Sequence, residues 1–296
     1  MRVFVTGATG FVGSAVVDEL RRRGHDVVGL ARSDRSAEVL REAGVKVHRG
    51  DIADPDTIKP ALGRADAVIH TAFNHDFTRY VANCEADGRL LKEMAHALNG
   101  ADKTLIATSA TVAAAGEPVT EADEAAREIP RSASEVFLGH SVNGVQTGVV
   151  RLPPTVHGPG DAAFVPALIA LARDRGASAY VDKGENRWPA VHRDDAARLF
   201  CDAVERRGSG ARYHAVAETG VAFREIAEAI GEGLSLPVRS VPKDRAEEHF
   251  GWLAMFATLD NPTSSEWTRA ATGWAPREAE LVSDMRASGY FNASPS

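Results

Sequence analysis

Three glycines near the start of the chain constrain its fold more than any other feature. They lie in the segment Gly7-Ala8-Thr9-Gly10-Phe11-Val12-Gly13, after a strand-like run and at the start of a helical pattern. In this setting the first glycine permits a tight turn, the second lets a pyrophosphate approach the backbone, and the third lets helix and strand pack closely. The free N–H groups at the helix start favour an anion. The segment therefore predicts a dinucleotide-binding loop, to which Gly7, Thr9, Gly10, Phe11, Val12 and Gly13 contribute.

Short apolar runs alternate with amphipathic helical patterns as far as Leu152. The strand-like runs are Val3–Val5, Val27–Leu30, Val45–His48, Ala67–His70, Thr104–Thr108 and Gly148–Leu152. The helical patterns between them include Val12–Arg23, Ala37–Ala43, Ile58–Leu62 and Arg79–Leu98. This alternation predicts an α/β fold, a Rossmann-like doubly wound parallel sheet with helices on both faces.

The pattern becomes less regular after Val156. A helix (Phe164–Arg175) leads to a loop with Asn186-Arg187-Trp188-Pro189, and further helices and strands follow at Asp194–Arg206, Ala211–Val216, Phe223–Gly233 and Val238–Val241. We expect residues 1–155 to form the dinucleotide-binding domain, with 191–216 returning to it. Residues 156–190 and 217–296 are expected to form a smaller C-terminal substrate-binding lobe that closes a cleft.

Composition excludes several functional classes. The formal net charge of −7 argues against a nucleic-acid surface, which needs clustered Lys and Arg. Cys84 and Cys201 have no metal-ligand spacing around them, so no metal site is expected. No apolar run approaches the roughly 18 residues that span a bilayer, and no signal-peptide pattern is present. We expect a cytoplasmic monomer or homodimer that acts on a small molecule.

Several motifs resemble those of one family. TGATGFVG is similar to the TGxxGxxG motif of extended short-chain dehydrogenases/reductases, and Arg151–Gly160 is similar to their RxxNVYGPG segment. Arg187 followed by Val191-His192-Arg193-Asp194-Asp195 resembles R…IHVDD, and Gly273-Trp274-Ala275-Pro276 matches GWxP. Because these landmarks occur in the family's order, the chain is identified as an extended or atypical member, similar to the NAD-dependent epimerases and dehydratases.

The resemblance implies further cofactor contacts. Asp51 and Ile52 end the third strand, where the family holds the adenine amine, and Thr71 and Ala72 would run beside the ribose and phosphates. Pro153 and Val156 belong to the segment that contacts nicotinamide.

The end of the second strand indicates which dinucleotide binds. Arg32 and Ser33 stand about 20 residues beyond the glycine loop, where an NAD-selective site would place an acidic residue for the ribose 2′-hydroxyl. A guanidinium and a hydroxyl suit a 2′-phosphate instead. Arg32 could also be a solvated arginine whose field Asp34 reduces. We favour NADP over NAD.

The family's catalytic Tyr-x-x-x-Lys motif is absent, because none of the four tyrosines has a lysine at the fourth following position. Aligning Glu135 with a family acidic residue puts Arg131 at the lysine position and Arg127 at the tyrosine position. If both lay on one helix they would share a face, although Pro130 argues for a helix start after Arg127. The resemblance places the catalytic hydroxyl at Ser109. Arg131 is also expected to hold the nicotinamide ribose.

Arginine cannot donate a proton near neutral pH, so a reduction needs its proton from another group or from water. His157, Tyr180 and Ser109 are the alternatives, and His157 could instead pack beneath its loop. Asn186, Arg187 and Trp188 lie where binding residues collect. In nucleotide-sugar relatives the matching arginine contacts phosphate, and Trp188 could face a substrate ring or belong to the core.

Three functions remain compatible with the sequence. The first is an NADP(H)-dependent oxidoreductase acting on a carbonyl, alcohol or related centre of a small organic metabolite. The second is an epimerase, isomerase or dehydratase with transient redox chemistry. The third is a non-catalytic NADP-binding sensor.

Overall fold

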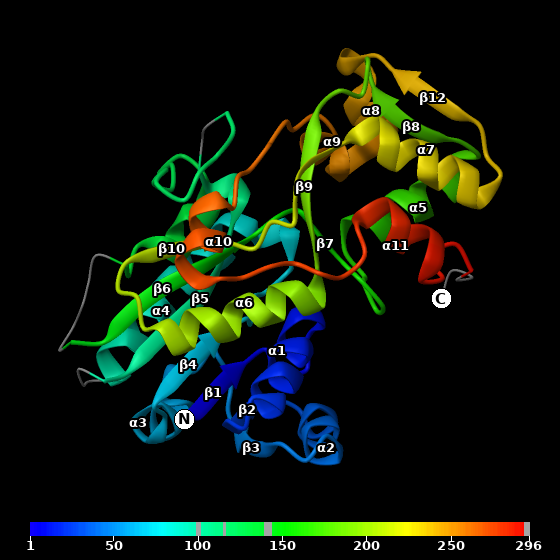
Figure 1. Cartoon of the computed structure of the whole chain (residues 1–296). Helices are drawn as coiled ribbons and strands as arrows, with labels where there is room; N and C mark the ends of the chain where they lie inside the picture. Colours follow the sequence, from blue (N-terminus) through cyan, green and yellow to red (C-terminus); the bar gives the residue numbers. More distant parts are fainter. Residues whose placement is uncertain (99–101, 115–116, 139–143, 293–296) are drawn as a thin grey trace.

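The computed structural model describes residues 1–98, 102–114, 117–138 and 144–292. A seven-stranded parallel sheet in the order β10-β6-β5-β4-β1-β2-β3 forms its centre (Figure 1). The strands are β1 (Arg2–Thr6), β2 (Asp26–Ala31), β3 (Lys46–Arg49), β4 (Ala67–His70), β5 (Thr104–Ala110), β6 (Gln146–Leu152) and β10 (Ala211–His214). β1 pairs with β2 on one side and β4 on the other, so the strand order reverses at β1 and β4. The predicted Rossmann-like fold class is confirmed.

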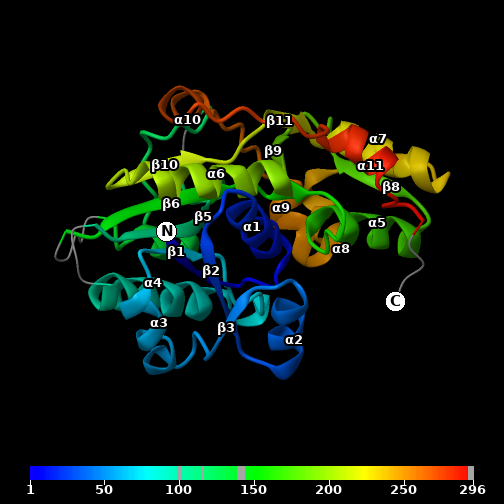
Figure 2. The same cartoon turned by 60° about the horizontal axis from the view of Figure 1, so that its bottom comes forward.

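Helices cover both faces of this sheet (Figure 2). One layer consists of α1 (Phe11–Arg22), α2 (Asp34–Glu42) and α6 (Arg193–Arg206), and the other includes α3 (Lys59–Arg64) and α4 (Tyr80–Leu98). β1 reflects this arrangement, since Val3 and Val5 join the core under α1 whereas Phe4 joins the core under α4. A strand that is buried on both faces is apolar throughout, which is why these runs read as strands in the sequence.

The C-terminal part builds a smaller lobe with its own apolar core. It contains the sheet β11-β9-β7 and the parallel pair β12-β8. Its strands are β7 (Thr155–His157), β8 (Ser178–Val181), β9 (Arg187–His192), β11 (Glu218–Ala222) and β12 (Val238–Val241). Its helices are α5 (Phe164–Arg175), α7 (Phe223–Leu234), α8 (Ala246–Phe250), α9 (Ala254–Ala257) and α11 (Leu281–Ala287). α10 (Glu266–Thr272) packs against α6 and β10 instead.

One sequence expectation about this lobe is wrong. Arg187, Trp188 and Pro189 lie on strand β9 and not on a loop. Proline has no N–H for a strand ladder, which is why the run resembled a loop. The register of β11 shifts between Glu218 and Val221, opposite Pro189, so the antiparallel pairing accommodates the missing donor.

Short 3₁₀ helices connect many of these elements. They are η1 (Pro55–Thr57), η2 (Phe77–Arg79), η3 (Thr111–Ala113), η4 (Pro130–Glu135), η5 (Lys243–Arg245) and η6 (Gly251–Leu253). None of the helices in the described ranges combines the length and apolar character needed to cross a bilayer.

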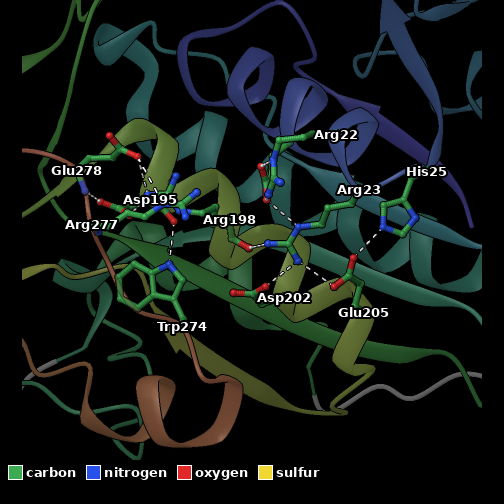
Figure 3. Close-up of polar contacts among 11 residues, drawn as sticks. Arg22, Arg23, His25, Asp195, Arg198, Asp202, Glu205, Trp274, Arg277 and Glu278 are labelled. Atoms are coloured by element: carbon green, nitrogen blue, oxygen red, sulfur yellow. Dashed lines mark hydrogen bonds and ion pairs between the residues drawn. The ribbon is translucent and has the colours of Figure 1, made fainter.

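Ion pairs join α6 to its neighbours (Figure 3). At one end Arg23, just after α1, contacts Glu19, Asp202 and Glu205. At the other end Asp195 holds the returning C-terminal segment: its carboxylate accepts the backbone N–H groups of Arg277 and Glu278, each at 3.0 Å. The carbonyl oxygen of Asp195 accepts a 2.9 Å hydrogen bond from the Trp274 indole. Two of the sequence landmarks, Asp194-Asp195 and Gly273-Trp274, therefore meet in space.

Replacing Asp195 should destabilise the fold. Asp195→Ala leaves two backbone N–H groups without an acceptor and removes one carboxylate from Arg198, which we expect to cost about 3 kcal/mol. The melting temperature should fall by roughly 5 °C in scanning calorimetry. Asp194→Ala, next door but 46% exposed at its side chain, serves as the control and should cost less than about 1 kcal/mol. Equal losses for the two variants would contradict the role given to Asp195.

Candidate active site

The glycine loop has the geometry of a phosphate cradle. Gly7 has φ +68°, and a Cβ there would lie 2.7 Å from the backbone nitrogen of Ala72. A Cβ at Gly13 would lie 2.0 Å from the Gly7 carbonyl oxygen. Gly10 is the N-cap of α1, and no side chain caps the helix there. The first N–H groups of α1 therefore have no side-chain cap, and at a helix start that follows β1 such groups can bind an anion.

The other residues expected to contact a cofactor follow strands of the same sheet. Thr71 and Ala72 follow β4, and the Thr71 hydroxyl donates a 2.7 Å hydrogen bond to the Thr6 carbonyl. Asp51 and Ile52 come soon after β3, and Pro153 directly follows β6. Val156 is the exception, because it lies on β7 in the three-stranded sheet of the lobe. Since the strands of the seven-stranded sheet are parallel, the positions that follow β3, β4 and β6 share its carboxyl edge, where ligands of such folds bind.

Arg32 and Ser33 follow β2 at this edge. Ser33 caps α2: its hydroxyl accepts the Ser36 N–H at 3.1 Å. Arg32 is exposed. The Asp34 carboxylate, which could reduce the field of Arg32, is 3.0 Å from the Arg49 guanidinium. An arginine from β3 therefore offsets this acidic neighbour.

A buried polar chain crosses the ends of β1, β4 and β5. The Thr6 hydroxyl and the Asp87 carboxylate lie 2.8 and 2.9 Å from the two ring nitrogens of His70. Asp87, on α4, also accepts a 2.9 Å hydrogen bond from Arg131, and Arg131 donates a second one to the Thr108 carbonyl at 2.8 Å. Burial would raise the pKa of Asp87, but His70 and Arg131 outweigh it and hold that pKa low. Arg131 is thus fixed over the end of β5, and its guanidinium lies 4.3 Å from the Phe73 ring centroid.

Glu135 is the centre of a second buried cluster. Arg151 donates to its two carboxylate oxygens at 2.7 and 2.8 Å, and Arg212 contributes a bond of 3.1 Å. Burial raises the pKa of this carboxyl, yet the bonds from Arg151, Ser109 and Arg212 together hold it below its ordinary value.

Ser109 belongs to this second cluster. It is buried, and its hydroxyl donates a 2.7 Å hydrogen bond to Glu135. The expectation that the Ser109 hydroxyl faces a reacting oxygen is therefore corrected, because this hydroxyl donates its hydrogen bond to the Glu135 carboxylate.

Arg127 does not share a helix with Arg131. It is exposed in a turn, and η4 begins only at Pro130. The proline fixes this start, because its ring is accommodated in a first helical turn but not further along. Of the two arginines at the vacated positions, the structure brings only Arg131 to the buried end of β5.

The lobe residues expected to bind substrate have structural partners. Asn186 donates to the carbonyls of Ala257 and Leu259, each at 3.1 Å. Trp188 is completely buried between Phe164 and Phe223, so it belongs to the lobe core and offers no face to a substrate ring.

Two further lobe residues are held by neighbouring charges. Arg187 binds the Asp260 carboxylate with two bonds of 3.0 and 2.7 Å, and these lower the pKa of that acid. The Arg224 guanidinium lies over the Tyr180 ring, 5.2 Å from the ring centroid. The same ring packs over Gly184 on the β8 side of the lobe.

His157 lies beneath its loop. It is fully buried, and its Nδ1 is 2.8 Å from the Asp284 carboxylate on α11. Burial lowers its pKa despite this partner. His192 lies beside it, 5.4 Å between ring centroids, and caps α6 by accepting the Asp194 N–H. Of the two roles considered for His157, the structure favours packing over proton donation.

The sequence interpretation missed Asp87, and it used Glu135 only to align the chain with the family. A signal existed on α4, where Tyr80, Cys84 and Asp87 recur with helical spacing on a face that should be apolar.

Comparisons with known proteins agree with the fold and indicate the family. Residues 3–216 match the model of the NAD dependent epimerase/dehydratase family. An uncharacterized protein of Schizosaccharomyces pombe is 47% identical over 98% of this chain and 100% of its own length. The 2-alkyl-3-oxoalkanoate reductase of Stenotrophomonas maltophilia is 30% identical over 71% of this chain and 67% of its own. The dTDP-glucose 4,6-dehydratase DesIV of Streptomyces venezuelae, solved with NAD and TYD bound, shares the fold with a TM-score of 0.77, 20% identity and coverage of 99% and 97%.

Removing the charge of Glu135 should destabilise the protein in a pH-dependent way. Glu135→Gln leaves the completely buried Arg151 without a counter-charge, at a cost of about 3 kcal/mol at pH 7. Because the pKa of Glu135 is lowered on folding, its contribution is complete above pH 4.5 and is lost as the pH falls towards the lowered value. Urea unfolding at pH 7 and at steps from pH 5 down to about pH 3 measures this difference. Glu124→Gln, an exposed carboxylate near Arg212, is the control; a difference from the parent that does not shrink in acid would refute the assignment.

Proposed function

The chain belongs to the NAD-dependent epimerase/dehydratase family, and from this we propose that it is an NADP(H)-dependent oxidoreductase acting on a carbonyl or alcohol of a small organic metabolite. The observation that carries the proposal is the glycine loop, whose uncapped helix start and absent side chains leave room for a dinucleotide pyrophosphate. The reductase from Stenotrophomonas maltophilia supports the reaction type.

The residues present fit a nicotinamide dinucleotide. Gly7, Gly10 and the start of α1 would hold the pyrophosphate, Asp51 and Ile52 the adenine, and Thr71 and Ala72 the adjoining ribose and phosphate. Pro153 and Val156 would lie beside the nicotinamide, and Arg131 would hold its ribose. When bound, the reduced dinucleotide supplies a hydride to the substrate carbon.

Arg131 would act as a fixed cation. Its bonds to Asp87 and to the Thr108 carbonyl orient it before any ligand binds, and a preorganised charge can stabilise a developing oxyanion. It does not release its proton near neutral pH. The proton for a reduction must therefore come from another group or from water.

The lobe favours a substrate without a diphosphate. Arg187 occupies the position that contacts phosphate in nucleotide-sugar relatives, but here both oxygens of Asp260 neutralise it. Recruiting it for a phosphate would require that bidentate pair to break.

Gly10→Val should separate binding from folding. Gly10 has φ −77°, so a side chain causes no backbone strain there, and its Cβ would approach only the Gly7 carbonyl, at 3.1 Å. We expect a folded protein whose NADPH affinity falls more than about 100-fold, because the side chain would fill the pyrophosphate position. Gly13→Val should instead lose stability, since its Cβ would clash with Gly7. Fluorescence titration and circular dichroism test both variants, and parental NADPH affinity in Gly10→Val would disprove the cradle.

Arg32→Asp should reverse the preference between the two cofactors. Losing a charge-assisted hydrogen bond to the 2′-phosphate costs about 1.5–3 kcal/mol, or roughly 10- to 100-fold in NADPH affinity. The new carboxylate suits the 2′-hydroxyl of NADH. Arg41→Asp makes the same charge change in the last turn of α2 and should leave the preference unchanged. Equal binding of NADPH and NADH by the parent protein would remove the 2′-phosphate assignment.

A further inference from the structure

One face of α4 is polar although it is turned inward. Tyr80, Cys84 and Asp87 are spaced by four and three residues, so they lie on the same side of the helix. Gly88 follows on this side, and a Cβ there would lie 2.6 Å from the carbonyl oxygen of Ala133 in η4. α4 therefore meets η4 backbone to backbone, and its polar side chains face Arg131. Apolar residues would serve packing better there, which indicates a chemical role.

Tyr80 has specific neighbours in this arrangement. Its ring meets the Phe73 ring edge-on, with centroids 6.4 Å apart, and Arg131 lies against the same Phe73. The Tyr80 hydroxyl and the Cys84 thiol influence each other's pKa, and the positive charge of Arg131 acts on both groups. Phe73 itself follows Thr71 and Ala72 at the end of β4, beside the switch point of the sheet. A phenol, a cation and the carboxyl ends of β4 and β5 are thus gathered in one place.

The electrostatics of this group suit a proton donor. Burial raises the pKa of Tyr80 to about 12, and the Arg131 charge opposes this increase. The phenol is therefore protonated at neutral pH, and the nearby guanidinium favours the phenolate that remains once the proton has left. The hydrogen bonds from Arg131 to Asp87 and to the Thr108 carbonyl keep the guanidinium in position. The same fixed charge is therefore present before and after the phenol loses its proton.

We propose that Tyr80 is the acid–base residue of this site and that Arg131 positions it and stabilises its phenolate. The inference rests on the proposed function. In the reductive direction the Tyr80 O–H bond breaks as an O–H bond forms on the substrate carbonyl oxygen, while the carbonyl carbon receives the hydride of the reduced dinucleotide. The carbonyl is reduced to an alcohol, the dinucleotide is oxidised, and the phenolate recovers a proton from water. Tyr80 on α4 would thereby supply the proton that the tyrosine of the absent Tyr-x-x-x-Lys motif supplies in the family.

Proton release on cofactor binding tests this without a known substrate. An opposite charge within about 4–6 Å lowers the pKa of an acid by roughly 1–3 units. The positive nicotinamide ring of NADP⁺ should therefore release a fraction of a proton from Tyr80, increasing from pH 8.5 to 10, whereas NADPH should release none. Titration calorimetry in buffers of different ionisation enthalpy measures this number. His75, which packs on the other side of Phe73, is already neutral in this range.

Variants assign the proton to its source. Tyr80→Phe should abolish the release while NADP⁺ affinity stays within about threefold. Cys84→Ala, which removes the neighbouring thiol, and Tyr180→Phe, which removes a tyrosine of the outer lobe, should both retain it. Circular dichroism and melting temperature show whether each variant is folded. With any carbonyl that the parent reduces, Tyr80→Phe should lower kcat by roughly 100- to 10,000-fold and leave KM unchanged.

The outcomes separate this inference from the proposed function. If neither dinucleotide binds the parent protein, the proposed function fails and this inference falls with it. If NADP⁺ binds but the parent releases no proton, or if Tyr80→Phe releases as much as the parent, dinucleotide binding stands and the role of Tyr80 is overturned.

Discussion

The close approach of α1 to the ends of β1 and β4 is the contact on which the site depends. At Gly13 the helix comes so near to Gly7 that no side chain could fit between them. This contact aims the start of α1 at the carboxyl edge of the sheet, where its N–H groups remain available. Because every strand of the sheet is parallel, the residues after β2, β4, β5 and β6 meet at the same edge. The remaining side chains act within a geometry that this contact has set.

The arginines of the molecule illustrate a second constraint. Arg131, Arg151 and Arg187 each bind a carboxylate, respectively Asp87, Glu135 and Asp260. Arg131 and Arg151 are buried, and a buried cation needs such a partner because leaving it unpaired costs several kcal/mol, whereas the Arg187 pair is partly exposed. The partner also determines what the cation can still do. Arg151 is saturated inside the protein, whereas Arg131 retains one side against Phe73 and Tyr80.

The sequence predicted the fold well where local physics decides it. A glycine loop between a buried strand and an amphipathic helix pattern indicates one local structure, the tight turn that begins α1. The elements β4, α5 and β12 span the same residues that the sequence predicted for them. The candidate site was less predictable, because its contacts join residues far apart in the chain. No residue close to Arg187 in the sequence indicates that Asp260 is its partner. In the same way, no residue close to Ser109 in the sequence indicates that the Ser109 hydroxyl donates to Glu135. Pro130 alone gave local warning that Arg127 and Arg131 would separate.

The path of the chain between the two parts limits how the molecule can move. The backbone passes from the large sheet to the lobe after β6, returns between β9 and α6, leaves again after β10, and returns once more to form α10 before ending in α11. A domain that swings open does so about one or two connections, which act as a hinge. Here all of the connections between the large sheet and the lobe would have to bend together. Asp195 on α6 holds the last of these connections through the N–H groups of Arg277 and Glu278. A hinge motion of the lobe against the large sheet would therefore require several connections to bend at the same time.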